Sequence, residues 1–318
     1  MTPPVLLAVP NFSEGRREQT ITAIARALVG EDAADAALRA RLLDVHSDPD
    51  HHRSVFTLAA RQGDLADALL RGAAVAVQQI DVMTRAGGDP AQAGQHPHVG
   101  ALDVAPVVYL DAAARGAACA EALVLADRIG HQLDVPVFLY GELTQRHDRS
   151  ATARAELRRG GVAGLAARMS ASPSAAPAQS PLVPDFGPPR MHPTAGATLV
   201  AARAPLVAFN LQLASPATLA DARATAALIR EGGVEGLPGV RAIGVALGTG
   251  LAQVSMNVER PLEVSLAEVV QAVARHHRVA SAELVGLAPR AALEGFPQDI
   301  PMPGFDSARQ LIENALGC

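Results

Sequence analysis

A histidine-containing loop between residues 94 and 100 is the first candidate for chemistry. His96 lies between Gly-Gln and a proline, and the chain continues through Gly100 into an apolar segment. Pro97 and Gly100 disfavour a helix, so the sequence predicts that His96 lies on a rigid loop beside a buried strand. A histidine near its unperturbed pKa can accept and donate a proton at neutral pH, as group transfer requires. The same pattern also fits a structural histidine that is hydrogen-bonded to the backbone.

Other polar residues lie beside or within apolar segments. Asn11 follows the apolar run from Val5, and it either binds a ligand or belongs to a turn. Residues 48–53, Asp-Pro-Asp-His-His-Arg, include types that bind divalent metals, but adjacent side chains rarely converge on one ion. We therefore expect a substrate-binding loop in which Arg53 pairs with a carboxylate. Asp103 lies in an apolar segment and needs a partner, either a histidine that it orients or an arginine.

A second dense stretch runs from Asp185 to Gly196 and is rich in glycine and proline. This composition predicts an extended path with an exposed backbone, which suits a flat ligand whose anionic end Arg190 could hold. A structural crossover between domains is the alternative. Asn210 and Asn257 lie within apolar strands, where a polar side chain needs a hydrogen-bond partner, so both could face a shared cleft.

The composition limits the classes of function. The 318 residues carry a net charge of −5, and all 27 basic residues are arginine, so nucleic acid and anionic membranes are poor partners. The absence of lysine from the sequence excludes a lysine Schiff base and a P-loop lysine. Cys119 and Cys318 form no disulfide framework, and we find neither a signal peptide nor an apolar run of ~18 residues. We therefore expect a soluble cytoplasmic protein.

Apolar periodicity predicts the elements that position these residues. The first half is expected to form strand, helix, strand, strand, helix and strand at residues 5–9, 13–29, 42–46, 54–59, 64–80 and 101–110. The second half repeats this order with strands at 206–213, 240–247, 251–259 and 279–287 and with helices at 215–231 and from 265. The expected helix caps are Ser13 with Gly30, Ser215 with Pro216, and a capping box of Ser265 and Glu268.

The repeated order predicts an α+β fold of two tandem ferredoxin-like (βαββαβ) units. Between them we expect a helix at 112–133, a strand at 135–140 and a helix that ends before residue 160. A linker rich in serine, alanine and proline follows at 169–184, and a short helix is expected at 303–318.

Several of these stretches together resemble the formiminotransferase family. The matching segments run in order through nearly the whole chain. They are residues 9–15 (VPNFSEG), 42–45 (LLDV), 53–55 (RSV), 96–97 (HP), 100–104 (GALDV), 135–137 (VPV), 139–142 (LYGE), 184–188 (PDFGP), 196–198 (GAT), 251–257 (LAQVSMN) and 283–287 (ELVGL).

The resemblance implies an N-terminal subdomain at residues 1–205 and a C-terminal subdomain at 206–318, with a ligand cleft between them. It implies a monofunctional form without the cyclodeaminase domain that longer relatives carry. The implied reaction transfers the formimino group from N-formimidoyl-L-glutamate to N5 of tetrahydrofolate, a step of histidine degradation, with tetrahydrofolate as co-substrate and no metal. We also expect a homodimer.

The resemblance also assigns roles to residues. His96 matches the catalytic histidine, which would act as general acid and base. The folate-binding segment corresponds to Gly187, Pro188, Pro189, Arg190, Met191, His192, Pro193, Thr194, Ala195 and Gly196. The residues expected to bind substrate are Asn11, Arg53, Asp103, Asn210 and Asn257.

The chain departs from the family pattern near the expected site. Relatives usually carry Lys-Gly-Glu-His-Pro-Arg around the catalytic histidine, whereas residues 93–98 here are Ala-Gly-Gln-His-Pro-His. His52 stands where asparagine is common, and His46 where aspartate often appears. The alternatives are therefore a related folate-dependent transferase that uses N-formylglutamate, or a folate-binding protein without catalysis.

Overall fold

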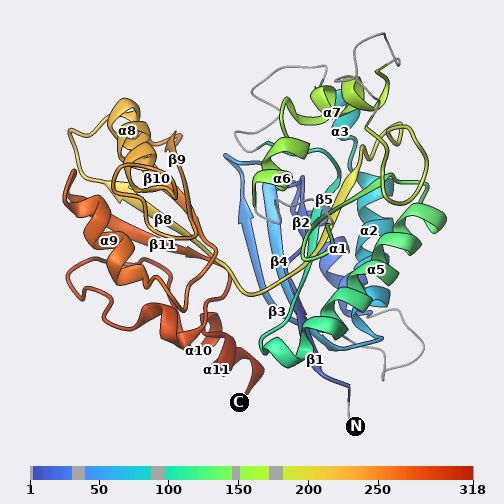
Figure 1. Cartoon of the computed structure of the whole chain (residues 1–318), viewed down its shortest axis with the longest axis horizontal. Helices are drawn as coiled ribbons and strands as arrows, with labels where there is room; N and C mark the ends of the chain where they lie inside the picture. The colour runs from blue at the N-terminus through green and yellow to red at the C-terminus, as the bar shows by residue number, and fades with distance from the viewer. Residues whose placement is uncertain (1–2, 31–39, 87–96, 145–150, 172–181, 318) are drawn as a thin grey trace. The chain divides into compact units, whose positions relative to one another are not determined.

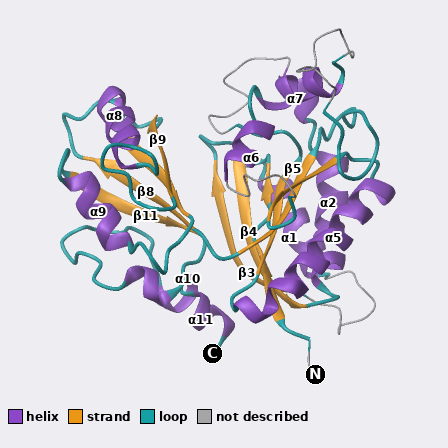
Figure 2. Cartoon of the chain, in the orientation of Figure 1, coloured by secondary structure: helices purple, strands orange, loops and turns teal. Residues whose placement is uncertain are grey.

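The structure, a computed structural model, describes residues 3–30, 40–86, 97–144, 151–171 and 182–317. It divides into two compact units, Met1–Arg203 and Ala204–Cys318, each with its own sheet and helices (Figures 1 and 2). The structure therefore confirms the α+β class. Within the described ranges, no helix has both the length and the apolar character needed to cross a membrane.

The described part of the first unit is built on a seven-stranded sheet. Its strands are β1 (Val5–Ala8), β2 (Asn11–Phe12), β3 (Arg41–Asp48), β4 (Arg53–Arg61), β5 (Leu102–Val108), β6 (Val137–Gly141) and β7 (Thr198–Arg203). Both β1 and β2 pair antiparallel with β4 and with β5, so together they occupy one central position in the sheet. β3 lies outside β4, while β7 and β6 continue the sheet parallel to β5.

Helices cover both faces of this sheet. They are α1 (Glu18–Val29), α2 (Leu65–Gln79), α3 (Val82–Ala86), the 3-10 helix η2 (Ala112–Ala114), α5 (Arg115–Gln132), α6 (Ala151–Leu157) and α7 (Gly161–Met169). One buried apolar cluster joins α1, α2 and α5 to the sheet, and a second joins α6 and α7 to strands β5, β6 and β7. The two clusters fix the sheet between helical layers, so the loops at the strand ends are held in place.

The second unit has a four-stranded antiparallel sheet in the order β11-β8-β10-β9. Its elements are β8 (Val207–Leu213), α8 (Leu219–Ile229), β9 (Val240–Ala246), β10 (Ala252–Val258), α9 (Leu266–Ala274), β11 (Val279–Val285), the 3-10 helix η3 (Arg290–Leu293), α10 (Ser307–Gln310) and α11 (Ile312–Leu316). Alternate strand residues pack with α8 and α9 in one apolar cluster, so the helices cover one face of the sheet.

Most predicted elements are present, and the order strand, helix, strand, strand, helix, strand holds in both units. Strand β7 was not predicted from the sequence, and the segment that forms β6 was predicted to lie between the units, whereas β6 belongs to the first sheet. Helices α3 and α7 were not predicted either. Parallel partners lie far apart in sequence, because a crossover must connect them, so periodicity alone does not identify them.

Two predicted helix caps are wrong and two are confirmed. Ser13 does not cap α1, which begins at Glu18, because the Ser13 hydroxyl donates instead to the carbonyl of Gly100 at 2.7 Å. Thr218, three residues after the predicted Ser215, caps α8 in a capping box. Gly30 ends α1 in the left-handed conformation, and Ser265 and Glu268 form the predicted capping box of α9.

Candidate active site

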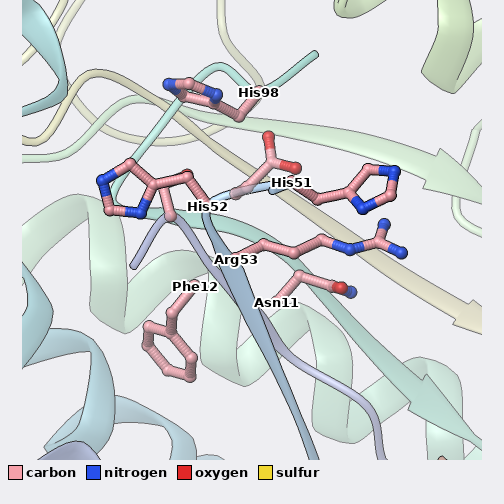
Figure 3. A pocket seen from close by; sticks show the side chains of 8 residues that line it. Asn11, Phe12, His51, His52, Arg53 and His98 are labelled. Atoms are coloured by element: carbon pink, nitrogen blue, oxygen red, sulfur yellow. The ribbon is translucent and has the colours of Figure 1, made fainter. Parts of the chain in front are cut away.

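Three segments of the first unit converge on one small cavity (Figure 3). Because β2 pairs antiparallel with both β4 and β5, the end of β2 meets the starts of β4 and β5. The free volume is about 10 Å³, room for about one water molecule. The cavity is lined by Asn11, Phe12, Ser13, His51, His52, Arg53, His98 and Asp103. Three of the predicted substrate-binding residues, Asn11, Arg53 and Asp103, are thus brought together with three histidines.

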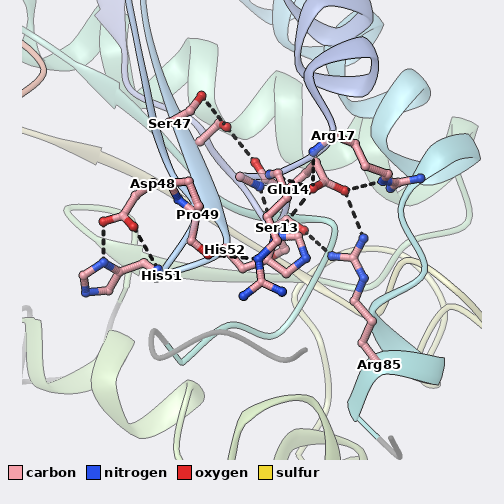
Figure 4. A network of polar contacts seen from close by, with 12 residues as sticks. Ser13, Glu14, Arg17, Ser47, Asp48, Pro49, His51, His52 and Arg85 are labelled. Carbon is pink, nitrogen blue, oxygen red and sulfur yellow. Dashed lines mark hydrogen bonds and ion pairs between the residues drawn. The ribbon is translucent and has the colours of Figure 1, made fainter. Parts of the chain in front are cut away.

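The buried carboxylate of Glu14 lies beside this cavity, next to the lining residue His52 (Figure 4). It accepts hydrogen bonds from the backbone N–H groups of Arg16 and Arg17, both at 3.0 Å, and from the side chains of Arg17 at 2.6 Å and Arg85 at 3.0 Å. Burial alone raises the pKa of Glu14, but these hydrogen bonds outweigh it and lower the pKa from 4.5 to about 2. Glu14 is therefore ionised at neutral pH.

His52 is held in one tautomer beside this carboxylate. The backbone N–H of Gly15 donates to Nδ1 of His52 at 3.1 Å, and the same nitrogen lies 3.5 Å from Oε1 of Glu14. Because Nδ1 accepts, the ring proton belongs on Nε2. Burial and the nearby charge of Arg85 lower the pKa of His52 from 6.5 to about 4. At neutral pH, His52 is therefore an uncharged ring that can donate through Nε2.

The adjacent His51 has a different environment. Oδ1 of Asp48 accepts hydrogen bonds from the backbone N–H groups of Asp50 and His51, both at 2.9 Å, while its Oδ2 contacts Nδ1 of His51. Burial raises the pKa of Asp48, but the bonds from His51 dominate and lower it from 3.8 to about 2. An ionised carboxylate therefore orients the imidazole of His51, which is only 6% exposed.

Asp103 is paired with an arginine, one of the two partners left open by the sequence. Its Oδ2 forms a buried ion pair with Nη2 of Arg158, and its Oδ1 accepts from the backbone N–H of Val99 at 2.8 Å. The hydrogen bond from Val99 fixes the backbone next to His98, which lines the cavity.

The predicted folate-binding segment forms an irregular path on the first unit. It is anchored at its end, where His192 and Gly196 exchange backbone hydrogen bonds of 2.9 and 3.2 Å. The backbone N–H of Ala195 donates to Nδ1 of His192 at 3.0 Å, and burial lowers the pKa of this ring. Arg190 is exposed and pairs with Asp134 at 2.9 Å, so an anionic ligand would compete with this carboxylate.

The other two predicted binding residues lie in the second unit. Phe209, Leu211 and Met256 point toward the helices, so Asn210 in β8 and Asn257 in β10 share the opposite face of the sheet. Asn210 is buried, and its side-chain amide donates to Oε2 of Glu283 at 2.8 Å. Both residues thus lie on one face of the sheet, and their role in binding stays a prediction.

His96, the predicted catalytic histidine, lies outside the described residues. The buried carboxylate of Glu14 and the pairing of Asp48 with His51 were not predicted from the sequence. The spacing Asp-Pro-Asp-His is a usable signal for that pair, because a carboxylate often accepts from backbone N–H groups two and three residues later. Among the described residues, no group of three His, Cys, Asp or Glu side chains is arranged to hold a metal ion.

Comparison with known proteins finds a family whose members match this chain along most of its length. The family profile described as "Formiminotransferase domain, N-terminal subdomain" matches residues 5–203. A glutamate formimidoyltransferase of Streptococcus pyogenes serotype M1 is 33% identical over 322 residues, which cover 98% of each chain. A glutamate formimidoyltransferase of Thermoplasma acidophilum is 32% identical over 95% of this chain and 94% of its own length. The formimidoyltransferase-cyclodeaminase of Sus scrofa is 36% identical over 90% of this chain but over only 50% of its own length.

Proposed function

The chain belongs to the formiminotransferase family, and on that premise we propose that it transfers a formimidoyl group from N-formimidoyl-L-glutamate to N5 of tetrahydrofolate. One observation carries the proposal. The chain aligns over 98% of its length with 98% of a relative that is named for this activity on glutamate. It spans about half the length of the cyclodeaminase-containing relatives, and the alignment covers 90% of this chain.

The reaction requires two proton transfers. A bond forms between N5 of tetrahydrofolate and the amidine carbon, and the bond between that carbon and the glutamate nitrogen breaks. N5 loses a proton as it adds, and the glutamate nitrogen gains one as it leaves. We propose that His96 is a general acid and base of this exchange, since a histidine can take and return protons at neutral pH.

The proposed binding residues fall into three groups. Asn11, Arg53 and Asp103 line the cavity, where the guanidinium of Arg53 suits a carboxylate of the donor. Residues 187–196 bind folate along their irregular backbone, which ends in the turn at residues 192–196. Asn210 and Asn257, which share a sheet face, bind substrate through their amides.

We further propose that the two compact units are the N- and C-terminal subdomains and that each is built on a ferredoxin-like core. The support is the order β-α-β-β-α-β together with the antiparallel sheet order β11-β8-β10-β9 in the second unit, and the order β3-β4-β1-β5 in the first. A homodimer and a cytoplasmic location stay predictions from the sequence.

The test is an assay of purified protein with tetrahydrofolate and N-formimidoyl-L-glutamate that detects 5-formimidoyl-tetrahydrofolate. We expect product from the wild-type protein, and a loss of about 100-fold or more in kcat for His96→Ala. Saturable folate binding without product would refute the proposal for this donor. N-formylglutamate would then be tried, and the failure of both donors would favour a folate-binding protein without catalysis.

A further inference from the structure

The Asp48–His51 pair has a geometry that the proposed reaction can use. We propose that His51, oriented by Asp48, is a second acid–base residue of the site, which takes over from His96 the protonation of the glutamate nitrogen as it leaves. This inference deepens the proposed function and rests on it. It adds a catalytic role for His51 and a positioning role for Asp48.

Hydrogen bonds fix both carboxylate oxygens of Asp48. Its Oδ1 is held by two backbone N–H groups at 2.9 Å, from Asp50 and His51, which leaves Oδ2 for the imidazole of His51. Since the pKa of Asp48 is lowered to about 2, the carboxylate is ionised at neutral pH and accepts from Nδ1 of His51. The proton-exchanging nitrogen of His51 is then Nε2, as in a carboxylate-oriented catalytic histidine.

The position of His51 also suits this role. Its ring is 6% exposed and lines the same cavity as Asn11, Arg53 and Asp103 (Figure 3). A proton donor in this cavity lies among the groups that are proposed to bind the donor substrate. The ionised carboxylate of Asp48 can stabilise the positive ring that donates the proton.

The neighbouring His52 has surroundings that differ from those of His51. His52 lies in the same loop, but Gly15 donates to its Nδ1, and the pKa of His52 is lowered to about 4. The ring of His52 is therefore uncharged at neutral pH, so it lacks the extra proton that a general acid gives up. The two adjacent rings are therefore held differently. Nδ1 of His52 accepts from a backbone N–H group, whereas Nδ1 of His51 donates to a carboxylate.

The resulting steps are balanced in atoms and charge. The base of the proposed reaction takes the proton that N5 loses, while Nε2 of His51 gives one proton to the glutamate nitrogen. The carbon–nitrogen bond to glutamate breaks with its electron pair going to that nitrogen, and glutamate leaves as an amine. Exchange with water returns one proton to His51 and removes one from the base, so both groups recover their starting states.

The inference predicts a dependence on pH, because His51 must be protonated to act as an acid. The charged and titratable groups around the cavity and beside His52 come from several elements. Asp48 ends β3, Asp50 and His52 lie in the β3–β4 loop, and Arg53 begins β4. Glu14 and Arg16 follow β2, and Arg85 belongs to α3. His98 precedes β5, Asp103 lies in β5, and Arg158 follows α6. A general acid produces a descending limb in the pH profile of kcat, and this limb should depend on the presence of His51.

The experiment compares His51→Gln and Asp48→Asn with a matched pair on the surface. His131 and Asp127 form a similar contact of 3.4 Å, but their side chains are 80% and 55% exposed on α5. We expect His51→Gln to lower kcat by about 100-fold and Asp48→Asn by about tenfold, with KM changed by less than about threefold. His131→Gln and Asp127→Asn should retain wild-type kcat.

Two readouts separate an acid from a structural residue. His51→Gln should lose the descending limb of the pH profile, and His51→Ala should regain activity when imidazole is added. An active wild-type protein with unchanged kcat and pH profile in His51→Gln would overturn this inference alone. Lowered kcat with the descending limb retained and no imidazole rescue would also overturn it. No product from the wild-type protein would overturn the proposed function, and this inference with it.

Discussion

Replacement of Glu14 by glutamine tests the buried carboxylate network beside the cavity. In Glu14→Gln, the amide oxygen can still accept from the backbone N–H groups of Arg16 and Arg17. The amide nitrogen, however, would face Nε of Arg17 and Nη2 of Arg85, which are donors themselves. The variant therefore places donors against donors in a region where Glu14 has no exposed surface.

The expected magnitude follows from the pKa of Glu14. A lowering from 4.5 to about 2 corresponds to about 3 kcal/mol of folding free energy, at about 1.4 kcal/mol per pKa unit. The loss of one partner from a buried ion pair typically costs about 3–5 kcal/mol, which agrees. Because the folded pKa is depressed, this stabilisation is present above pH ~4.5, the value expected for the unfolded chain, and is lost as the pH falls through about 2.

The assay is denaturant unfolding of both proteins at pH 7 and near pH 3. We expect the free energy of unfolding of Glu14→Gln to be lower by about 3 kcal/mol at pH 7, and by less than about half of that near pH 3. Glu156→Gln is the control, since Glu156 is 52% exposed and lies 3.9 Å from Arg159, a surface pair worth under about 1 kcal/mol. A difference for Glu14→Gln that is the same at both pH values would refute the electrostatic argument.

Three further outcomes follow from the geometry. The ring signals of His52 in NMR should titrate near pH 4 because burial opposes its charge; a midpoint above about 6 would contradict this environment. Gly196→Ala should lower the melting temperature more than Gly250→Ala, although both glycines have positive φ. At residue 196 the added methyl group would lie 2.4 Å from a backbone oxygen, whereas at residue 250 it would meet no atom within 4 Å. Asp103→Asn should lower the free energy of unfolding by about 3–5 kcal/mol, because it leaves Arg158 buried without its carboxylate. A decrease of less than about 1 kcal/mol in urea unfolding would show that the pair is not buried in solution.

The sequence predicts local structure where the determining interactions lie a few residues apart. The capping box of Ser265 and Glu268 and the end of α1 at Gly30 were both predicted from residue type and spacing. The same reasoning was wrong at Ser13, because a hydroxyl that suits a helix cap bonds to a carbonyl 87 residues away instead. Long-range contacts therefore override a local preference at the very segment that lines the cavity.

The sequence by itself determined the α+β class, most strands and helices and the family resemblance, and it marked Asn11, Arg53 and Asp103 as candidate site residues. Only the tertiary structure decided that these three residues line one cavity, since this follows from the pairing of β2 with β4 and β5. It also decided that Asp103 pairs with an arginine 55 residues away. Periodicity and caps depend on neighbours within a turn or two, whereas strand pairing and buried charge depend on segments that only folding brings together.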